Sequence, residues 1–347
     1  MRLLLGAVLV AAVALPSSAQ QEPKKPVVAH TSPDPKKCRK CWPAYEKAME
    51  YLQKNLGKAS FPAKMVIGWL LLADGRFESD LKQIITTARN ALKERGSSQH
   101  AQNWYPALAG MLLCEYYKYF PTKDVFDAIQ EIVNDFVKTQ ERTGGWFKWF
   151  EGAYKDRLDY PVKDLGILDA TIFGVLWSAK THGVKVPDDT IAKADKCLEQ
   201  ILGAEGISYG TSQRGGDTTG ARGGFCIQGL FFAGQTKHKI YTTYERCLVR
   251  KIPKMDQGHH VGAFHCLGVT LGCHILGQEA YNELVKEWLD KLIDKQDAEG
   301  AVYVGDDGDA GGEIGLLKSN YGSTAAYALL ILLQDQKVLR PPAKRKK

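Results

Sequence analysis

Residues 210–224 combine glycines with charged side chains in a way that suits anion binding and acid–base chemistry. Arg214, Asp217 and Arg222 lie in this segment, which leads directly into an apolar, helix-like segment. Glycine N–H groups, a helix N-terminus and two guanidinium groups together favour a carboxylate, sulfate or phosphate. Asp217 is the candidate acid/base group. The alternative is a tight connection between helices that needs glycine for steric reasons.

Two adjacent histidines, His259 and His260, begin another apolar segment. A histidine near the surface is a candidate general acid or base because its pKa lies near neutrality. Neighbours on a helix point about 100° apart, so only one of the two can face a given site. No two histidines here have the i, i+4 spacing that chelates zinc, and no metal site is predicted from them. His265 and His274 lie deeper in the segment and are interpreted as buried, hydrogen-bonded side chains.

One acidic segment is the only cofactor option that the sequence offers. Its carboxylates are Asp306, Asp307, Asp309 and Glu313. Closely spaced oxygen ligands suit calcium, but the further ligands of an EF-hand loop are missing. A solvated acidic turn is therefore the favoured interpretation, and no other cofactor is predicted.

Two kinds of helical segment alternate along the chain and must position these groups. Segments such as 124–140 are apolar on one face, whereas segments such as 165–179 are apolar all round. A one-faced helix covers a core, and a helix apolar on every side is surrounded by protein. The pattern predicts an all-α, (α/α)6 toroid of six helical hairpins, with outer and inner layers. The pairs are 42–56 with 63–73, 80–95 with 101–120, 124–140 with 163–180, 188–202 with 220–235, 240–251 with 258–276, and 279–296 with 320–334.

Polar and aromatic residues recur where the predicted inner helices begin, at one end of the axis that we call the mouth. Arg214, Arg222, Trp104, Asp169 and Tyr321 are the candidate ligand-binding residues there. Capping explains some of these side chains but not the paired histidines or Arg222. We expect Asp217, Arg222 and one of the two histidines to converge on a single pocket.

A repeated Gln–Gly–aromatic signature accompanies the helices. One copy has Gln140 followed by Gly144, Gly145 and Trp146. A second has Gln296 followed by Gly300 and Tyr303. A third and looser copy has Gln200 followed by Gly206 and Tyr209. This signature resembles that of the terpenoid cyclase / protein prenyltransferase superfamily of α/α toroids. The resemblance covers about residues 42–334 and is greatest to exported squalene-cyclase-like repeat proteins of unassigned activity. It implies fold more than activity.

The resemblance also implies a test for cyclase chemistry, which needs an Asp in a DxDDT-like motif. The nearest string is residues 186–190, where Val186 replaces the first Asp and the string opens an amphipathic helix. The zinc ligands of the prenyltransferases cannot be placed either. We therefore predict a toroid with a ligand-binding mouth for a small molecule or glycan, without an intact cyclase motif. A polysaccharide lyase or glycoside hydrolase, and a non-enzymatic scaffold or interaction protein, are the alternatives.

The chain ends differ in composition from the rest. Residues 1–19 are predicted to be a signal peptide cleaved after Ala19, so the protein is expected to be exported, periplasmic or secreted. Residues 20–41 form a Pro- and Lys-rich linker. Its CxxC motif predicts a local Cys38–Cys41 disulfide or a metal half-site, in preference to redox catalysis. Residues 42–336 are the predicted toroid domain, and residues 337–347 are a basic tail suited to anionic surfaces. Without Arg2, residues 20–41 and residues 340–347, the formal charge of +7 falls to −3, because 7 − 1 − 4 − 5 = −3. Neither a nucleic-acid groove nor a membrane span is expected.

Overall fold

The structure is a computed structural model that describes residues 35–95, 103–146, 166–209, 220–255, 262–303 and 320–335. Contacts place these residues within one compact unit, Thr31–Lys347. The described part contains no helix long and apolar enough to cross a membrane. The predicted signal peptide, most of the linker and the basic tail lie outside the described residues.

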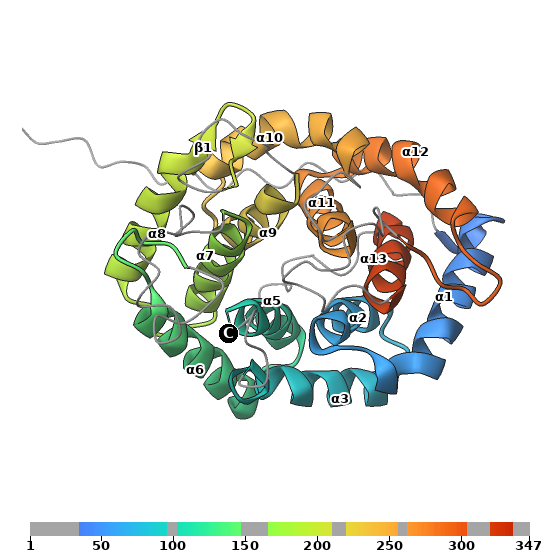
Figure 1. The fold of residues 1–347 in the computed structure, drawn as a ribbon, viewed down its shortest axis with the longest axis horizontal. Coiled ribbons are helices and arrows are strands. Elements are labelled where there is room, and N and C mark those ends of the chain that lie inside the picture. The colour runs from blue at the N-terminus through green and yellow to red at the C-terminus, as the bar shows by residue number, and fades with distance from the viewer. Residues whose placement is uncertain are drawn as a thin grey trace, which may run out of the picture. The chain divides into compact units, whose positions relative to one another are not determined.

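Helices in two concentric rings make up the unit (Figure 1). The outer ring consists of α1 (Cys41–Asn55), α3 (Glu78–Arg89) with the short α4 (Ala91–Glu94), α6 (Lys123–Thr139), α8 (Asp188–Ile201), α10 (Lys239–Lys251) and α12 (Gln278–Asp294). The inner ring consists of α2 (Phe61–Asp74), α5 (Trp104–Tyr119), α7 (Gly166–Thr181), α9 (Gly220–Phe232), α11 (Gly262–Leu276) and α13 (Asn320–Leu332). Each inner helix packs on the next, and α13 packs on α2, which closes the ring. The predicted (α/α)6 toroid is confirmed.

Short elements complete the described structure. The 3-10 helices are η1 (Pro35–Lys37), η2 (Leu56–Lys58), η5 (Ile252–Lys254) and η6 (Leu333–Asp335). A two-residue pair, β1 (Leu202–Gly203) and β2 (Gly206–Ile207), is antiparallel. Gly203 therefore lies in this pair. A serine is typical of a helix N-cap, but α3 begins at Glu78, so Ser79 lies inside the helix.

Burial separates the two rings as the apolar patterns predict. The outer helix α6 buries one stripe, which consists of Val125, Ala128, Ile129, Ile132, Val133 and Phe136. The inner helix α11 buries every residue from Ala263 to Ile275. A helix surrounded on all sides has no face left for water, so its sequence is apolar throughout.

Glycines bring α7, α9 and α11 into backbone contact. A Cβ at Gly224 of α9 would lie 1.7 Å from the carbonyl oxygen of Gly268 on α11. A Cβ at Gly229 would lie 2.1 Å from the carbonyl oxygen of Gly174 on α7. Any side chain at these positions would force the helices apart, which explains the glycine-rich sequence of α9.

The Gln–Gly signature joins neighbouring outer helices. Gln140 Nε2 donates to the carbonyl oxygens of Gly144 (2.8 Å) and of Thr190 on α8 (2.9 Å). Gln296 Nε2 donates in the same way to Gly300 (3.1 Å) and to Ala44 on α1 (2.9 Å), and this bond joins the last outer helix to the first. The glutamine thus binds its own turn and the next outer helix.

Candidate functional site

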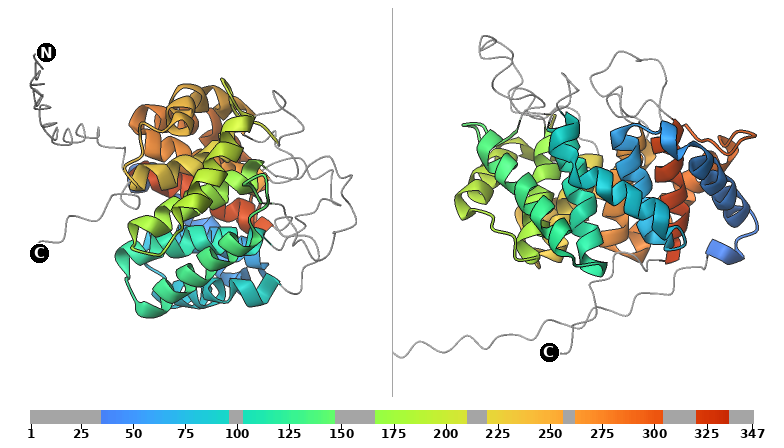
Figure 2. Two further views of the ribbon diagram at one scale, coloured as in Figure 1. Left: turned by 90° about the vertical axis from the view of Figure 1, so that its left-hand side faces the viewer. Right: turned by 90° about the horizontal axis from the view of Figure 1, so that it is seen from below.

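The mouth is formed by the N-terminal turns of the six inner helices. Because each outer helix is followed by an inner helix, all inner helices run in one direction and all outer helices run in the other (Figure 2). The N-termini of the inner helices and the C-termini of the outer helices therefore meet at the same end of the toroid.

Aromatic rings fill the axis just below the mouth. Trp104, the first residue of α5, is 2% exposed and contacts the ring of Phe264 on α11 edge-on, with centroids 5.0 Å apart. Phe264 in turn packs on Phe225 of α9 at 4.5 Å. Since α5 and α11 lie on opposite sides of the inner ring, these contacts span the axis. Trp104 Nε1 is buried, and none of the residues that the structure describes accepts a hydrogen bond from it.

Asp169, a predicted ligand-binding residue, holds the Gln–Gly signature in place. Its Oδ1 accepts a hydrogen bond of 2.6 Å from the backbone N–H of Trp146, and Asp169 is 1% exposed. Trp146 Nε1 donates to the carbonyl oxygen of Phe136 at 2.9 Å. The second copy of the signature uses a neutral group instead, because the Val302 N–H donates to Thr324 Oγ1 at 2.9 Å. Asp169 therefore joins α7 to the signature, and its predicted role in ligand binding stays a prediction.

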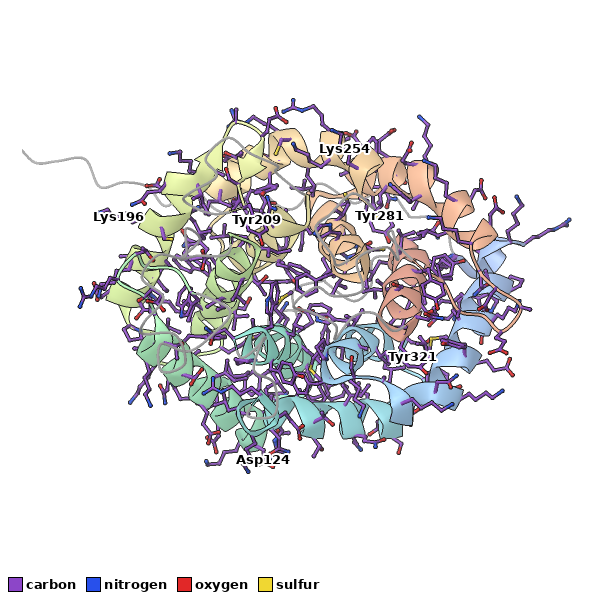
Figure 3. All side chains as sticks on the ribbon, in the orientation of Figure 1. Asp124, Lys196, Tyr209, Lys254, Tyr281 and Tyr321 are labelled. Carbon is purple, nitrogen blue, oxygen red and sulfur yellow. A yellow bond between two sulfur atoms is a disulfide. The ribbon has the colours of Figure 1, made fainter. Side chains whose placement is uncertain are left out.

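Arg222 lies in the first turn of α9 and is 3% exposed. Its Nη1 donates to the carbonyl oxygen of Ile207 at 3.2 Å, and its guanidinium lies over the ring of Tyr209, 5.5 Å from the centroid (Figure 3). This arginine joins the β2 turn to the start of the inner helix. It brings a buried positive charge to the mouth.

Several predicted site residues lie outside the described residues. These are Arg214, Asp217, His259, His260 and the possible calcium ligands Asp306, Asp307, Asp309 and Glu313. The predicted convergence on one pocket therefore stays a prediction. Within the described ranges, no group of three or more His, Cys, Asp or Glu side chains could hold a metal ion. His265 and His274 are buried, as expected.

Among the described residues, the first turns of the inner helices carry one acidic side chain, that of Asp169. Basic residues occupy the last turns of the outer helices α1, α3, α6, α10 and α12, where they offset the negative ends of the helix dipoles. The inner helices begin without Asp or Glu in the first turns of α2, α5, α9, α11 and α13. In α7 the one carboxylate, Asp169, is engaged with the Trp146 N–H.

The opposite end of the axis carries a buried ion pair. Lys118 Nζ contacts Glu115 Oε2, and these side chains are 5% and 1% exposed. Gln228 of α9 donates to Glu115 at 3.4 Å, and Lys118 lies over the ring of Phe232. Burial raises the pKa of Glu115 and lowers that of Lys118, while the attraction between the two charges opposes both shifts. This cluster joins α5 to α9 across the inner ring, and sequence patterns gave no sign of it.

The string that came nearest to a cyclase motif lies on the outside of the toroid. Asp188 pairs with Lys180 at 2.5 Å and Asp189 with Lys193 at 2.6 Å, and both carboxylates are largely exposed. Pro187, without a side-chain hydrogen bond, precedes α8 at the cap position. These aspartates therefore stabilise an outer helix end and face away from the axis.

All eight cysteines are described. Cys38 and Cys41 form a disulfide just before and at the start of α1. The other six are free and buried. Burial raises the pKa of the Cys114 and Cys266 thiols to about 12, so neither is a reactive thiolate at neutral pH.

The fold and the mouth define an α/α toroid with a polar and aromatic end. A family described as a domain of unknown function, DUF6288, matches residues 44–329, so the chain belongs to this family. Among solved structures the chain is similar to one titled Polysaccharide Lyase BACCELL_00875, with a TM-score of 0.52 and 12% identity over 85% of this chain and 96% of that one. At this identity the likeness shows the fold alone. No curated protein sequence matches.

Proposed function

We propose that this protein binds an acidic polysaccharide at the mouth and cleaves it by β-elimination. The shared direction of the inner helices and the scarcity of acidic residues in their described first turns carry the proposal. Each helix N-terminus has the effect of about half a positive charge, and six parallel N-termini around one axis add up. With the described first turns free of acidic residues except Asp169, a uronate carboxylate is the group that this end suits best.

Trp104 supports the same ligand class. Its indole N–H is buried at the mouth and has no acceptor, which costs about 1–3 kcal/mol in the free protein. An oxygen of a bound ligand, such as a carboxylate or hydroxyl oxygen, would satisfy this donor.

A polysaccharide lyase removes the proton on the carbon next to the uronate carboxylate and expels the glycosidic oxygen of the neighbouring sugar. His259 or His260 is our candidate base, because a neutral imidazole accepts a proton near pH 7. Arg222 and Arg214 would stabilise the negative charge that develops on the carboxylate, and Asp217 would return a proton to the leaving oxygen. The similar fold of a protein titled polysaccharide lyase supports this reaction over hydrolysis.

A terpenoid cyclase is a weaker candidate. Such an enzyme needs an apolar cavity for its substrate, whereas Trp104, Phe264 and Phe225 occupy the axis below the mouth. The aspartates of the nearest cyclase-like string face the outside. Export, which the N-terminal segment predicts, belongs to our proposal because it brings the protein to extracellular polysaccharides.

The direct test is incubation of the full chain with polygalacturonate, alginate and hyaluronan. A lyase creates reducing ends together with a C=C bond conjugated to the carboxylate, which absorbs in the ultraviolet. We expect both signals to rise, and both to disappear in His259→Ala or His260→Ala. Reducing ends without absorbance would mean hydrolysis, and binding without either signal would mean a binding protein. Absence of binding to any acidic polysaccharide would refute the proposal.

A matched pair of variants tests the mouth itself. Trp104→Phe removes the indole N–H at the mouth, and we expect affinity for the polysaccharide to fall about tenfold, as for one hydrogen bond to a charged group. Trp177→Phe is the control, because Trp177 Nε1 is also buried without an acceptor but lies near the other end of α7. Equal effects of the two variants would argue against a ligand at Trp104.

A further inference from the structure

Three tyrosines from separate parts of the chain gather on the rim of the mouth, where the outer ring closes. Tyr51 lies in the C-terminal half of α1, Tyr303 follows α12, and Tyr321 is the second residue of α13. The rings of Tyr51 and Tyr321 stack with centroids 5.6 Å apart and planes 28° apart (Figure 3 labels Tyr321). Tyr303 is 43% exposed, a large fraction for an aromatic side chain.

The backbone around Tyr303 is fixed by the Gln–Gly signature. The preceding residue, Val302, is fully buried, and its N–H donates to Thr324 Oγ1 on α13 at 2.9 Å. Two residues before Tyr303, the Ala301 N–H donates to Asp297 Oδ1 at 2.9 Å. The exposed ring therefore stands on a rigid support one helical turn from Tyr321. Such a preorganised group loses little entropy when a ligand binds.

Two charged side chains described near the tyrosines are engaged elsewhere. Lys47 Nζ donates to the carbonyl oxygen of Asp297 at 2.9 Å, and the Asp297 carboxylate accepts N–H bonds within its own turn. Burial, together with the phenols of Tyr321 and Tyr303 and the Asp297 carboxylate, raises the pKa of Tyr51 to about 12. The cluster thus presents ring faces and neutral hydroxyl groups.

We propose that Tyr51, Tyr303 and Tyr321 form a sugar-binding platform for a pyranose unit of the polysaccharide, apart from the cleavage centre on the axis. A pyranose has C–H groups on its faces and hydroxyl groups on its edges, which match aromatic faces and phenol hydroxyls. Three side chains are too few for a protein partner, since a stable interface buries at least about 1,000 Å². This inference rests on the glycan ligand of the proposed function.

Tyr303→Ala tests the platform without disturbing the core, because the ring is exposed. Phe120→Ala is a matched control: Phe120 is 46% exposed and stacks on Tyr116, but it follows α5 at the end opposite the mouth. Affinity electrophoresis in gels containing polygalacturonate, alginate, hyaluronan or hydroxyethylcellulose measures binding. For each polymer that the wild type binds, we expect Tyr303→Ala to raise the dissociation constant about tenfold, and Phe120→Ala to leave it unchanged.

The variant Tyr303→Phe keeps the ring and should bind within about threefold of the wild type. In turnover, Tyr303→Ala should raise KM and leave kcat unchanged, because the platform lies away from the axis. Wild-type binding by Tyr303→Ala would overturn the platform even if the protein cleaves the polymer. Loss of binding in Tyr303→Ala without cleavage by the wild type would support the platform and refute the lyase proposal. A wild-type protein that binds none of the polymers would refute both.

Discussion

The buried pair Glu115–Lys118 offers a sharp test of how the two ends of the axis differ. Its side chains are 1% and 5% exposed, so water cannot solvate either charge when its partner is removed. Breaking one partner of a buried ion pair costs about 3–5 kcal/mol, because the remaining charge is left uncompensated. Replacing both partners by neutral groups of similar size is often close to neutral.

We therefore expect Glu115→Gln and Lys118→Met each to lower the free energy of unfolding by about 3–5 kcal/mol. For Lys118→Met we expect a loss at the lower end of this range. Burial already raises the pKa of Glu115, and this side chain keeps its hydrogen bonds from Gln228 and Tyr119. The double variant should lie within about 1 kcal/mol of the wild type, which gives a coupling of several kcal/mol.

Urea unfolding at pH 7, followed by far-ultraviolet circular dichroism, provides these free energies for all four proteins. Two results would refute the reasoning: a single variant as stable as the wild type, or a double variant whose loss equals the sum of the single losses. Polysaccharide binding supplies an independent readout. Because the pair lies at the far end of α5 from Trp104, the folded double variant should bind as the wild type does.

Three further predictions concern stability and thiols. Gly224→Ala should destabilise the protein by about 3 kcal/mol or more in urea unfolding, whereas Gly57→Ala, where the new Cβ meets no atom within 4 Å, should change stability by less than about 1 kcal/mol. Burial lowers the pKa of His182 from 6.5 to about 4, so the unfolded chain gains a proton that the folded protein rejects, and the unfolding free energy should fall as pH drops from about 6.5 to about 4. His182→Gln should flatten that decline, and an unchanged pH dependence would contradict the assignment. With Cys38 and Cys41 bonded, thiol titration of the denatured, unreduced protein should find six thiols, and eight would contradict the disulfide.

The double ring could be predicted from the sequence because the helices of the two rings differ in how their apolar residues are distributed. A helix with one apolar stripe, such as α6, packs that stripe on a core. A helix that is apolar throughout, such as α11, is surrounded by other helices. Their alternation along the chain therefore favours an outer layer around an inner layer. The positions of the helix ends were harder to predict from the sequence. Ser79 has the right chemistry for a cap, yet α3 starts one residue earlier, because local capping preferences are weak beside tertiary packing.

The role of a polar residue near the mouth could not be read from its type. Asp169 and Arg222 both begin inner helices, and both were predicted to bind ligand. In the structure Asp169 accepts the Trp146 N–H, and Arg222 donates to the Ile207 carbonyl oxygen. These bonds span 23 and 15 positions of the chain, which local patterns do not specify, and the predicted role of both residues in ligand binding stays a prediction.

The parallel direction of the inner helices ties the fold to the proposed ligand. In a toroid of hairpins, a chain that alternates between rings has all inner N-termini at one end, so their dipoles add instead of cancelling. Outer helices bring negative ends to the same face, and here basic last turns offset most of them. The inner-helix dipoles favour negative charge near the axis, while the tyrosines lie on the rim. An acidic polysaccharide suits both regions of the mouth. Its carboxylates would bind near the inner-helix N-termini at the axis, and the C–H faces of its sugars would pack on the tyrosines of the rim.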